Sequence, residues 1–235
     1  MKKIAIFSGA GLDKESGINT FRDTNDGTWS NYNIDEVCTP TGWKKNREKV
    51  LDFYNERRSQ LKDVEPNDAH KQLVQLEEKF NVIHITQNVS DLLERAGATN
   101  VIHLHGELTK VRGTFFNGST TNYDTVYDIG YDEIKVGGKC EKTNSQLRPH
   151  IVWFEEYPFQ VDEAYTEIST ADILLIIGTS LSISYTLTLL SNVKEGCKVY
   201  YIDPNPVKTL SKYNITYIEK PATEGVKEFI EEISK

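Results

Sequence analysis

The 235-residue chain has little cysteine, no long apolar run and a shortage of basic residues, and each of these excludes a class of protein. Its three cysteines, Cys38, Cys140 and Cys197, lie far apart, which argues against a disulfide framework and against a four-cysteine zinc site. The mean hydropathy is -0.49 and no apolar run approaches the ~18 residues of a membrane span. With 27 basic and 35 acidic residues the net charge is -8, so we expect no binding to nucleic acid.

The N-terminal stretch is apolar only between Ile4 and Phe7, which is too short for the core of a signal peptide. We therefore expect a cytoplasmic protein that does not associate with membranes. The composition, 38% hydrophobic and 26% charged, is that of a globular chain, and the length suits a single domain.

Short apolar runs alternate with longer amphipathic stretches along the chain. The runs predict buried parallel strands at Ile4–Phe7, Val82–Thr86, Val101–Leu104, Asp172–Ile177, Lys198–Ile202 and Ile215–Ile218. The stretches predict helices at Lys49–Leu61, Ala69–Phe80, Val89–Ala96, Glu163–Thr170, Leu181–Val193 and Thr223–Ile233, with Asp68 as the cap of the second. This alternation predicts an α/β fold with a Rossmann-like parallel sheet flanked by helices.

Residues 109–148 interrupt the alternation, because they are rich in Gly, Thr, Asn, Asp and Tyr and predict no long helix. We expect a small β module there, since a structureless loop of that length is unusual. The predicted organisation is one domain over residues 1–235, with a large part at about 1–33, 62–108 and 149–235 and a small module at about 34–61 and 109–148.

A glycine-containing turn, Gly9-Ala10-Gly11, directly follows the first predicted strand. Glycine lets a backbone approach a phosphate closely, but the strict dinucleotide pattern fails because its third glycine would fall at Lys14. Taken alone, the turn is a weak signal. It continues, however, as GAGLDKESGINTFR over residues 9–22.

That longer string resembles the first motif of the sirtuins, GAGxSxxSGIPxFR, and further sirtuin-like motifs follow in order. They are TQNV at 86–89, LLERAG at 92–97, HLHGEL at 103–108, LRPHIVWF at 147–154 and GTS at 178–180. The stretch FYNERRSQL at 53–61 resembles the small bacterial members that remove succinyl and acetyl groups. The resemblance implies an NAD-dependent protein lysine deacylase.

The reaction that this resemblance implies needs a base. The acyl oxygen of a modified lysine attacks C1′ of the nicotinamide ribose, nicotinamide leaves, and a base then activates a ribose hydroxyl. A histidine can be neutral and basic near pH 7, and His105 stands at the position of the family's base. His103 is better explained as an alternating strand residue. Asn88 is the second residue that we expect to act in catalysis.

The resemblance also assigns residues to NAD. Gln87 and Asn88 would contact the nicotinamide ribose at the end of a strand, where open α/β sheets place ligands. Phe21 would shield that ribose from water, and Arg22 would contact the phosphates. The complete expected set is Gly9, Ala10, Gly11, Phe21, Arg22, Gln87, Asn88, Val89, Ser90, Gly178, Thr179, Ser180, Asp203 and Ala222.

Substrate recognition is expected at two places. Val152, Trp153 and Phe154 would contact the acylated protein or peptide. Tyr54 and Arg57 are spaced i, i+3 on a predicted helix, so both can project from one face and bind a carboxylate. We therefore expect a preference for succinyl or malonyl groups, with acetyl groups also accepted. Arg58 is a rival donor about 100° further round the helix.

Several residues depart from the family pattern. Asp13 replaces the first serine of the GAG motif, and Tyr185 replaces a proline after the GTS turn. Ser90 replaces the aspartate of TQNID, which in the family grips the nicotinamide amide. We expect Ser90→Asp to strengthen the response to nicotinamide, unless the neighbouring Asp91 has taken over that role.

The family's zinc module is the largest departure, because only Cys140 of the expected cysteine tetrad is present. We expect no metal, and an insert that folds by packing instead. Its expected apolar residues are Phe115, Phe116, Tyr123, Tyr127, Ile129 and Tyr131.

Two other functions fit the same motifs. One is NAD hydrolysis or ADP-ribosyl transfer, with water or another nucleophile in place of the acyl group. The other is a catalytically weak NAD-binding module, which the serine at position 90 keeps open.

Overall fold

The computed structural model of the protein describes residues 1–18, 32–114, 125–208 and 214–234. Its main feature is a six-stranded sheet in the order β3-β2-β1-β7-β8-β9, in which every neighbouring pair is parallel. The strands are β1 (Lys3–Ser8), β2 (Asn81–Thr86), β3 (Val101–His103), β7 (Ile173–Ile177), β8 (Lys198–Ile202) and β9 (Ile215–Ile218). The predicted α/β fold is confirmed, and each predicted strand is present to within a residue or two.

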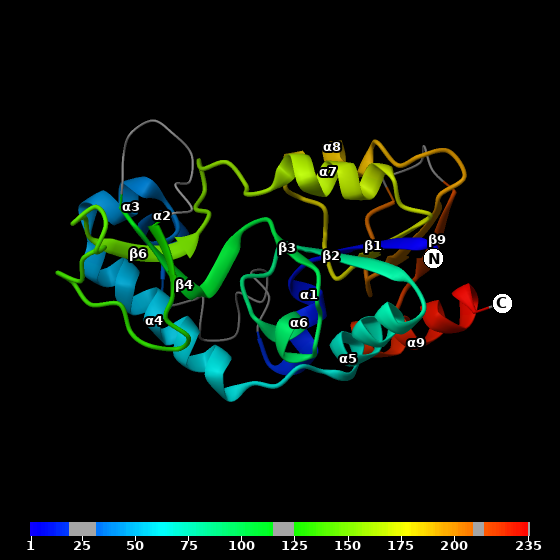
Figure 1. Ribbon diagram of the computed structural model, residues 1–235, viewed down its shortest axis with the longest axis horizontal. Helices are drawn as coiled ribbons and strands as arrows, with labels where there is room; N and C mark the ends of the chain where they lie inside the picture. The colour runs from blue at the N-terminus through cyan, green and yellow to red at the C-terminus, as the bar shows by residue number, and fades with distance from the viewer. Residues whose placement is uncertain (19–31, 115–124, 209–213, 235) are drawn as a thin grey trace.

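The central strands are buried on both faces because helices cover each side of the sheet (Figure 1). Alternate residues of β7 face opposite ways, so that Leu175 joins one apolar cluster and Leu174 the other. One face carries α5 (Asp68–Gln75) and α9 (Ala222–Ile233), together with the short α1 (Ala10–Asp13) and α6 (Leu92–Arg95). The other face carries α7 (Val161–Ser169) and α8 (Ser184–Leu190).

A second part of the molecule lies beside the carboxyl edge of the sheet, at the left of Figure 1. It contains α2 (Ile34–Val37), α3 (Pro40–Lys45), α4 (Arg47–Asp63) and a three-stranded antiparallel sheet in the order β5-β4-β6. The strands are β4 (Gly106–Gly113), β5 (Val126–Asp128) and β6 (Leu147–Ile151). Trp43 and Trp153 pack against each other at the centre of its apolar cluster, with ring centroids 5.6 Å apart.

The small β module expected in residues 109–148 is therefore present, although β4 begins earlier, at Gly106. Three of the expected apolar residues pack against the cluster that contains Trp43 and Trp153, namely Tyr127, Ile129 and Tyr131. The other three aromatic residues expected there, Phe115, Phe116 and Tyr123, lie outside the described residues.

In the described chain, α2, α3, α4 and α5 each begin at a residue whose side chain caps the helix. The cap of α5 is Asn67, whose side chain accepts hydrogen bonds from the backbone N–H groups of Ala69 and His70, so the prediction of Asp68 is wrong by one residue. Two 3-10 turns, η1 (Lys14–Ser16) and η2 (Leu76–Glu78), follow α1 and α5. No helix in the described ranges has the length and apolar character needed to cross a membrane.

Candidate functional site

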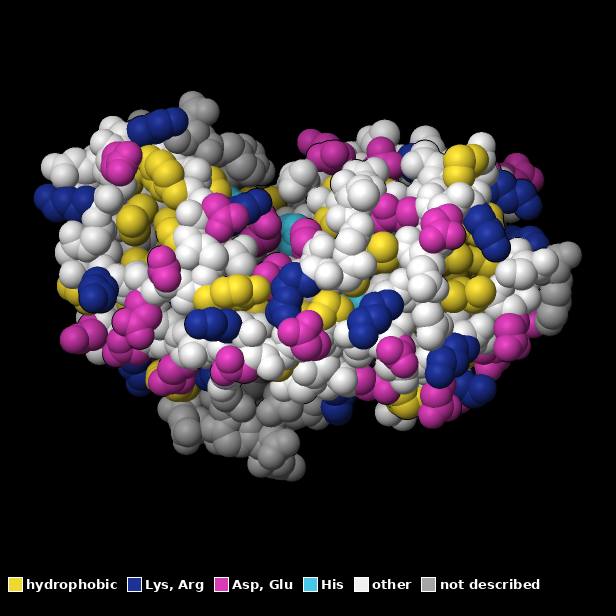
Figure 2. Space-filling view, turned by 60° about the horizontal axis from the view of Figure 1, so that its bottom comes forward, with side chains coloured by type: hydrophobic (Ala, Val, Ile, Leu, Met, Phe, Trp, Pro, Cys, Tyr) yellow, Lys and Arg dark blue, Asp and Glu magenta, His cyan; other side chains and the backbone are white. Residues whose placement is uncertain are grey.

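The expected NAD residues gather at the carboxyl edge of the parallel sheet. The chain leaves β1 for one side of the sheet and β7 for the other, so these two neighbours form the topological switch point at which α/β folds bind ligands. The loops after β1, β2 and β7 all begin there. Figure 2 shows a notch between the two parts of the molecule, with histidine side-chain atoms visible below it.

The loops after β1 and β7 lie in direct contact. The Gly11 N–H donates to the Gly178 carbonyl at 2.8 Å, and the Gly9 N–H donates to the Ile177 carbonyl at 3.0 Å. Gly178 has a φ of +60°, and a Cβ there would lie 2.4 Å from the Leu12 nitrogen. Only glycine fits this position, because a side chain would push the two loops apart.

Gln87 joins the loops after β2 and β7 to the segment that carries His105. Its side-chain oxygen accepts a hydrogen bond from the Thr179 hydroxyl at 2.9 Å. Its backbone carbonyl accepts one from the His105 Nδ1–H, also at 2.9 Å. Three separate motifs of the sequence thus meet at one residue.

His105 has both ring nitrogens occupied. Because Nδ1 donates to the Gln87 carbonyl, Nε2 carries the lone pair, and it accepts a hydrogen bond from the Tyr185 hydroxyl at 2.6 Å. Burial lowers the pKa of His105 to about 4, only partly offset by the bond to Gln87. The imidazole is therefore neutral at pH 7. Tyr185 was noted in the sequence only as a replacement for proline, and its contact with His105 spans 80 residues.

Two hydrogen bonds from its side-chain nitrogen fix the orientation of Asn88. Nδ2 donates to the Gly9 carbonyl at 3.1 Å and to the Asp13 carboxylate at 2.7 Å. The side-chain oxygen must then point away from both acceptors. His103, by contrast, is a buried structural residue that hydrogen-bonds Glu94 at 2.7 Å. Burial alone would lower the pKa of His103, but the hydrogen bond to Glu94 and the charges of Glu94 and Glu107 together raise it above the usual histidine value.

Asp13, like Tyr185, belongs to this site although the sequence motifs did not assign it there. Its buried carboxylate accepts hydrogen bonds from Asn88, from the Ser90 hydroxyl at 2.7 Å and from His70 at 3.1 Å. The two residues that depart from the family pattern at positions 13 and 90 are thus in contact. Their joint departure is the feature of the sequence that could have pointed to Asp13 as a site residue. Asp91 is engaged with the small module through one carboxylate oxygen, because Oδ2 accepts a hydrogen bond from the Tyr131 hydroxyl at 2.5 Å. Its buried Oδ1 has no hydrogen-bond partner among the described residues.

The other expected NAD residues are distributed around the same edge. Ser180 contacts Ser182, and Asp203 accepts a hydrogen bond from the Asn205 backbone N–H just after β8. Val89 lies at the border of the small module, and Ala222 is buried at the start of α9. Phe21 and Arg22 lie outside the described residues.

The expected substrate residues lie on a segment that runs from His105 to Cys38. The Val152 N–H donates to the His105 carbonyl and the Phe154 N–H to the Cys38 carbonyl, both at 2.9 Å. Between them, the buried Trp153 donates its indole N–H to the Tyr54 hydroxyl at 3.1 Å. Phe154 is 50% exposed.

Tyr54 contacts Cys38 from α4, and the charge of Arg57 lies near the same thiol. The Tyr54 hydroxyl donates to the Cys38 sulfur at 3.6 Å. Burial raises the pKa of the Cys38 thiol to about 11, opposed by Tyr54 and by the nearby charge of Arg57. Arg57 also lies over the Phe53 ring, 4.7 Å from its centroid. Arg58, the rival donor, is instead fully buried and donates to the Leu108 carbonyl at 2.7 Å.

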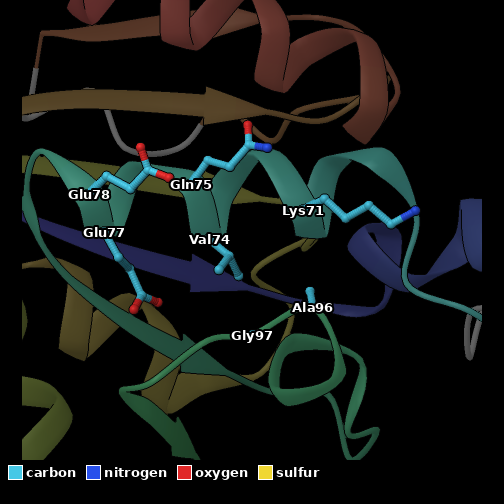
Figure 3. Close-up of a pocket in the computed structure, with 7 residues that line it drawn as sticks. All are labelled: Lys71, Val74, Gln75, Glu77, Glu78, Ala96 and Gly97. Atoms are coloured by element: carbon cyan, nitrogen blue, oxygen red, sulfur yellow. The ribbon is translucent and has the colours of Figure 1, made fainter.

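A separate pocket of about 550 Å³ lies between α5 and the turn after α6. Figure 3 shows Val74 pointing toward the Ala96–Gly97 turn, with Lys71 and Glu77 at its sides. None of the residues expected to bind NAD or substrate lines it.

Comparisons with known proteins give one consistent result. The sequence pattern of the Sir2 family matches residues 9–185. An NAD-dependent protein deacylase of Bacteroides thetaiotaomicron is 44% identical over 228 residues, covering 97% of this chain and 96% of that protein. A deacylase of the same description from Helicobacter pylori strain 26695 is 44% identical over 230 residues, covering 98% of this chain and 96% of that protein.

Solved structures agree. A Sir2 homologue in complex with NAD superposes with a TM-score of 0.85 at 34% identity, covering 99% of this chain and 90% of that chain. A Sir2 protein bound to the inhibitor EX-527, 2′-O-acetyl-ADP-ribose and a deacetylated p53 peptide superposes with a TM-score of 0.76 at 26% identity, covering 98% of this chain and 94% of that chain.

Proposed function

The chain belongs to the Sir2 family, and on that premise we propose which acyl groups this NAD-dependent protein deacylase removes from lysine. We propose that it removes succinyl and malonyl groups, and also acetyl groups, and that it releases nicotinamide and an O-acyl-ADP-ribose. NAD is a substrate here, because its ribose receives the acyl group. The observation that carries the proposal is a neutral His105 hydrogen-bonded to Gln87 at the carboxyl edge of the sheet.

In the proposed reaction, the acyl oxygen attacks C1′ of the nicotinamide ribose and nicotinamide leaves. His105 then accepts a proton from a ribose hydroxyl. Its hydrogen bond to Gln87 leaves the lone pair on Nε2, which is the form a base needs. The ribose hydroxyl has to replace the Tyr185 hydroxyl that occupies Nε2 in the free protein.

The loops at the carboxyl edge of the sheet offer hydrogen-bonding groups for the phosphates and the ribose of NAD. Within the described chain, the backbone N–H groups of Ala10, Thr179 and Ser180 make no hydrogen bond, so they are available to phosphate oxygens. The Asn88 amide gives both of its hydrogens to the protein, which leaves its oxygen to accept a bond from a ribose hydroxyl.

The preference for acidic acyl groups is supported by the surroundings of Cys38, which contacts the Tyr54 hydroxyl and lies near the charge of Arg57. The Val152 N–H bonds to His105 and the Phe154 N–H bonds to Cys38. In an extended segment, these two backbone nitrogens would lie about 7 Å apart. A lysine whose acyl carbonyl lies near His105 could therefore extend a longer acyl chain toward Tyr54 and Arg57. An arginine fork and a tyrosine hydroxyl can both donate to the terminal carboxylate of succinate or malonate.

The test compares kcat/KM for succinyl-, malonyl- and acetyl-peptides in the parent protein and in Arg57→Met. A charge-assisted contact stabilises by roughly 1.5–3 kcal/mol, so Arg57→Met should lose about 10–100-fold on succinyl-peptide and keep its acetyl activity. Arg47→Met is the matched control, because Arg47 is an exposed arginine of the same helix that lies over the Trp43 ring. Equal losses on both substrates would show that Arg57 supports the packing of Phe53 instead.

We propose further that the small module holds no zinc. Position 113, at the end of β4, is a glycine and offers no ligand. A Cβ there would lie 2.8 Å from both the Thr143 and Ser145 hydroxyls and 3.1 Å from the Cys140 Cβ, so the space of a ligand is already filled. Those two hydroxyls hydrogen-bond each other at 2.7 Å. One thiol among hydroxyls does not fit the four N or S ligands of a structural zinc site.

The peptide panel also separates the two alternatives. NAD hydrolysis would release free ADP-ribose and leave the peptide unchanged. A weak NAD-binding module would give neither product. Mass spectrometry of the mixture after incubation with NAD distinguishes all three outcomes.

A further inference from the structure

Asp13 is a buried carboxylate at the centre of the proposed NAD site. It is only 4% exposed, at the end of the short helix that follows the Gly9–Gly11 loop. A buried charge is costly unless hydrogen bonds replace its lost hydration. Here one carboxylate oxygen accepts from Asn88 and His70, and the other accepts from Ser90.

These bonds decide which atom Asn88 presents to a ligand. An amide side chain can be turned over, and its orientation follows from its partners. Both partners of the Asn88 nitrogen, the Gly9 carbonyl and the Asp13 carboxylate, are pure acceptors. The nitrogen must face them, so the oxygen faces away. A serine at position 13 could donate to that oxygen and would permit the opposite orientation.

Ser90 completes the arrangement from the other side. Its hydroxyl is buried and donates to Asp13 across 77 residues of sequence. Positions 13 and 90 therefore form one acid–hydroxyl pair. An aspartate introduced at position 90 alone would place two carboxylates in contact, and two such groups cannot both stay ionised. In this arrangement we therefore expect Ser90→Asp by itself to weaken the nicotinamide response rather than strengthen it.

We propose that Asp13 is the positioning residue of the NAD site: it fixes Asn88 with its oxygen toward the ribose and, with Ser90, supplies the acid–hydroxyl pair that the site requires. This inference rests on the proposed role of Asn88 in binding the ribose. The two departures from the family motifs, aspartate for serine at 13 and serine for aspartate at 90, are then a single reciprocal exchange. What the site needs is one carboxylate and one hydroxyl in contact, from either loop.

The experiment compares five proteins: the parent, Asp13→Ser, Ser90→Asp, the double variant D13S/S90D and Asp13→Asn. Each is assayed for kcat and KM toward NAD, inhibition by nicotinamide, and melting temperature. A misplaced contact at a reacting centre can cost about 100-fold, so each of the first two single variants should lose about 10–100-fold in kcat/KM for NAD. The double variant should recover to within about fivefold of the parent, because the serine at position 13 would donate its one proton to the aspartate at position 90 and its oxygen would again accept from Asn88.

Asp13→Asn is the conservative control. Its oxygen can accept from Asn88 and His70, and its amide can donate to Ser90, so it keeps the Asn88 orientation without the charge. It should retain more activity than Asp13→Ser by about tenfold or more. A merely structural role would lower the melting temperature of the variants without changing KM for NAD in the folded protein.

Two results would overturn the proposal. One is an Asp13→Ser protein with KM and kcat within threefold of the parent. The other is a double variant that recovers its melting temperature but is no more active than the weaker single variant. If Asp13→Ser does not fold, Asp13→Asn and the double variant still decide the matter. Asn88→Ala is assayed alongside: full activity there would contradict the proposed function, whereas an inactive Asn88→Ala with an active Asp13→Ser would contradict this inference alone.

Discussion

The hydroxyl of Tyr185 occupies the nitrogen that the proposed base must use, so we expect Tyr185→Phe to accelerate the step in which His105 takes a proton. The oxygen lies 2.6 Å from Nε2, and the two rings meet edge to face with centroids 6.0 Å apart. Phenylalanine keeps the ring and its packing and removes only the hydroxyl. The ribose hydroxyl would then bind Nε2 without displacing a competitor.

The size of the effect follows from the bond that is removed. A hydrogen bond between neutral groups contributes about 0.5–1.5 kcal/mol net, which corresponds to about a 2–10-fold increase in kcat/KM. The same bond stabilises the free protein, so the variant should melt about 2–4 °C lower per kcal/mol lost. Activity should therefore rise while stability falls.

The assay measures kcat/KM for acetyl-peptide at saturating NAD and, separately, the exchange of labelled nicotinamide into NAD. Exchange reports the departure of nicotinamide, which precedes the proton transfer, so it should not change. Tyr165→Phe is the control, because Tyr165 is 42% exposed on α7. A tenfold or larger loss of deacylation in Tyr185→Phe would refute the reasoning and would mean that Tyr185 passes the proton to His105.

Further predictions concern pH, metal and the loop contact. The pKa of His105 is about 4, below the usual histidine value, so the base stays neutral down to about pH 5. We therefore expect kcat/KM to be nearly constant between pH 8 and pH 6. A fall in kcat/KM with an apparent pKa near 6.5 would contradict this. The unfolded chain binds protons on His105 and His150 below about pH 6.5 and the folded chain does not, because burial lowers their pKa values to about 4 and about 3. These two groups therefore lower stability as the pH falls from 6.5 toward 4, and urea midpoints should be lower at pH 5 than at pH 7.5; a higher midpoint at pH 5 would count against it. Elemental analysis should find less than a tenth of a zinc ion per chain, and chelator should not change the melting temperature; stoichiometric zinc would refute the packing account of the small module. Gly178→Ala places a Cβ 2.4 Å from the Leu12 nitrogen and should weaken NAD binding at least about tenfold by calorimetry; unchanged affinity would show that the loops can separate freely.

The sequence predicted the parallel sheet well because buried parallel strands are apolar on both faces. The run at Ile173–Ile177 is such a case, and no amphipathic helix imitates it. Short helices were harder. The stretch Pro40–Lys45 has too few residues to show a helical period, and it is fixed by a Thr39 cap and by packing of Trp43. The predicted helix at Val89–Ala96 is shorter, beginning only at Leu92.

The motifs of the site could be read from the sequence, but the contacts between them could not. His105, Gln87 and Thr179 were each identifiable by position, whereas their hydrogen bonds join loops from three strands. The contacts of Asp13 with Ser90 and of Tyr185 with His105 span 77 and 80 residues. Each of these four residues was visible only as a single position, and pairing them requires the fold.

The measurement that tests the account most directly is the activity of His105→Ala together with its affinity for NAD. Removing a positioned base typically costs about 10²–10⁴-fold in rate, so mass spectrometry should show deacylation reduced by that amount. Calorimetry should show NAD binding within about threefold of the parent, because the loops after β1 and β7 are untouched. Near-normal turnover in His105→Ala would contradict the assignment of the base and, with it, the proposed mechanism.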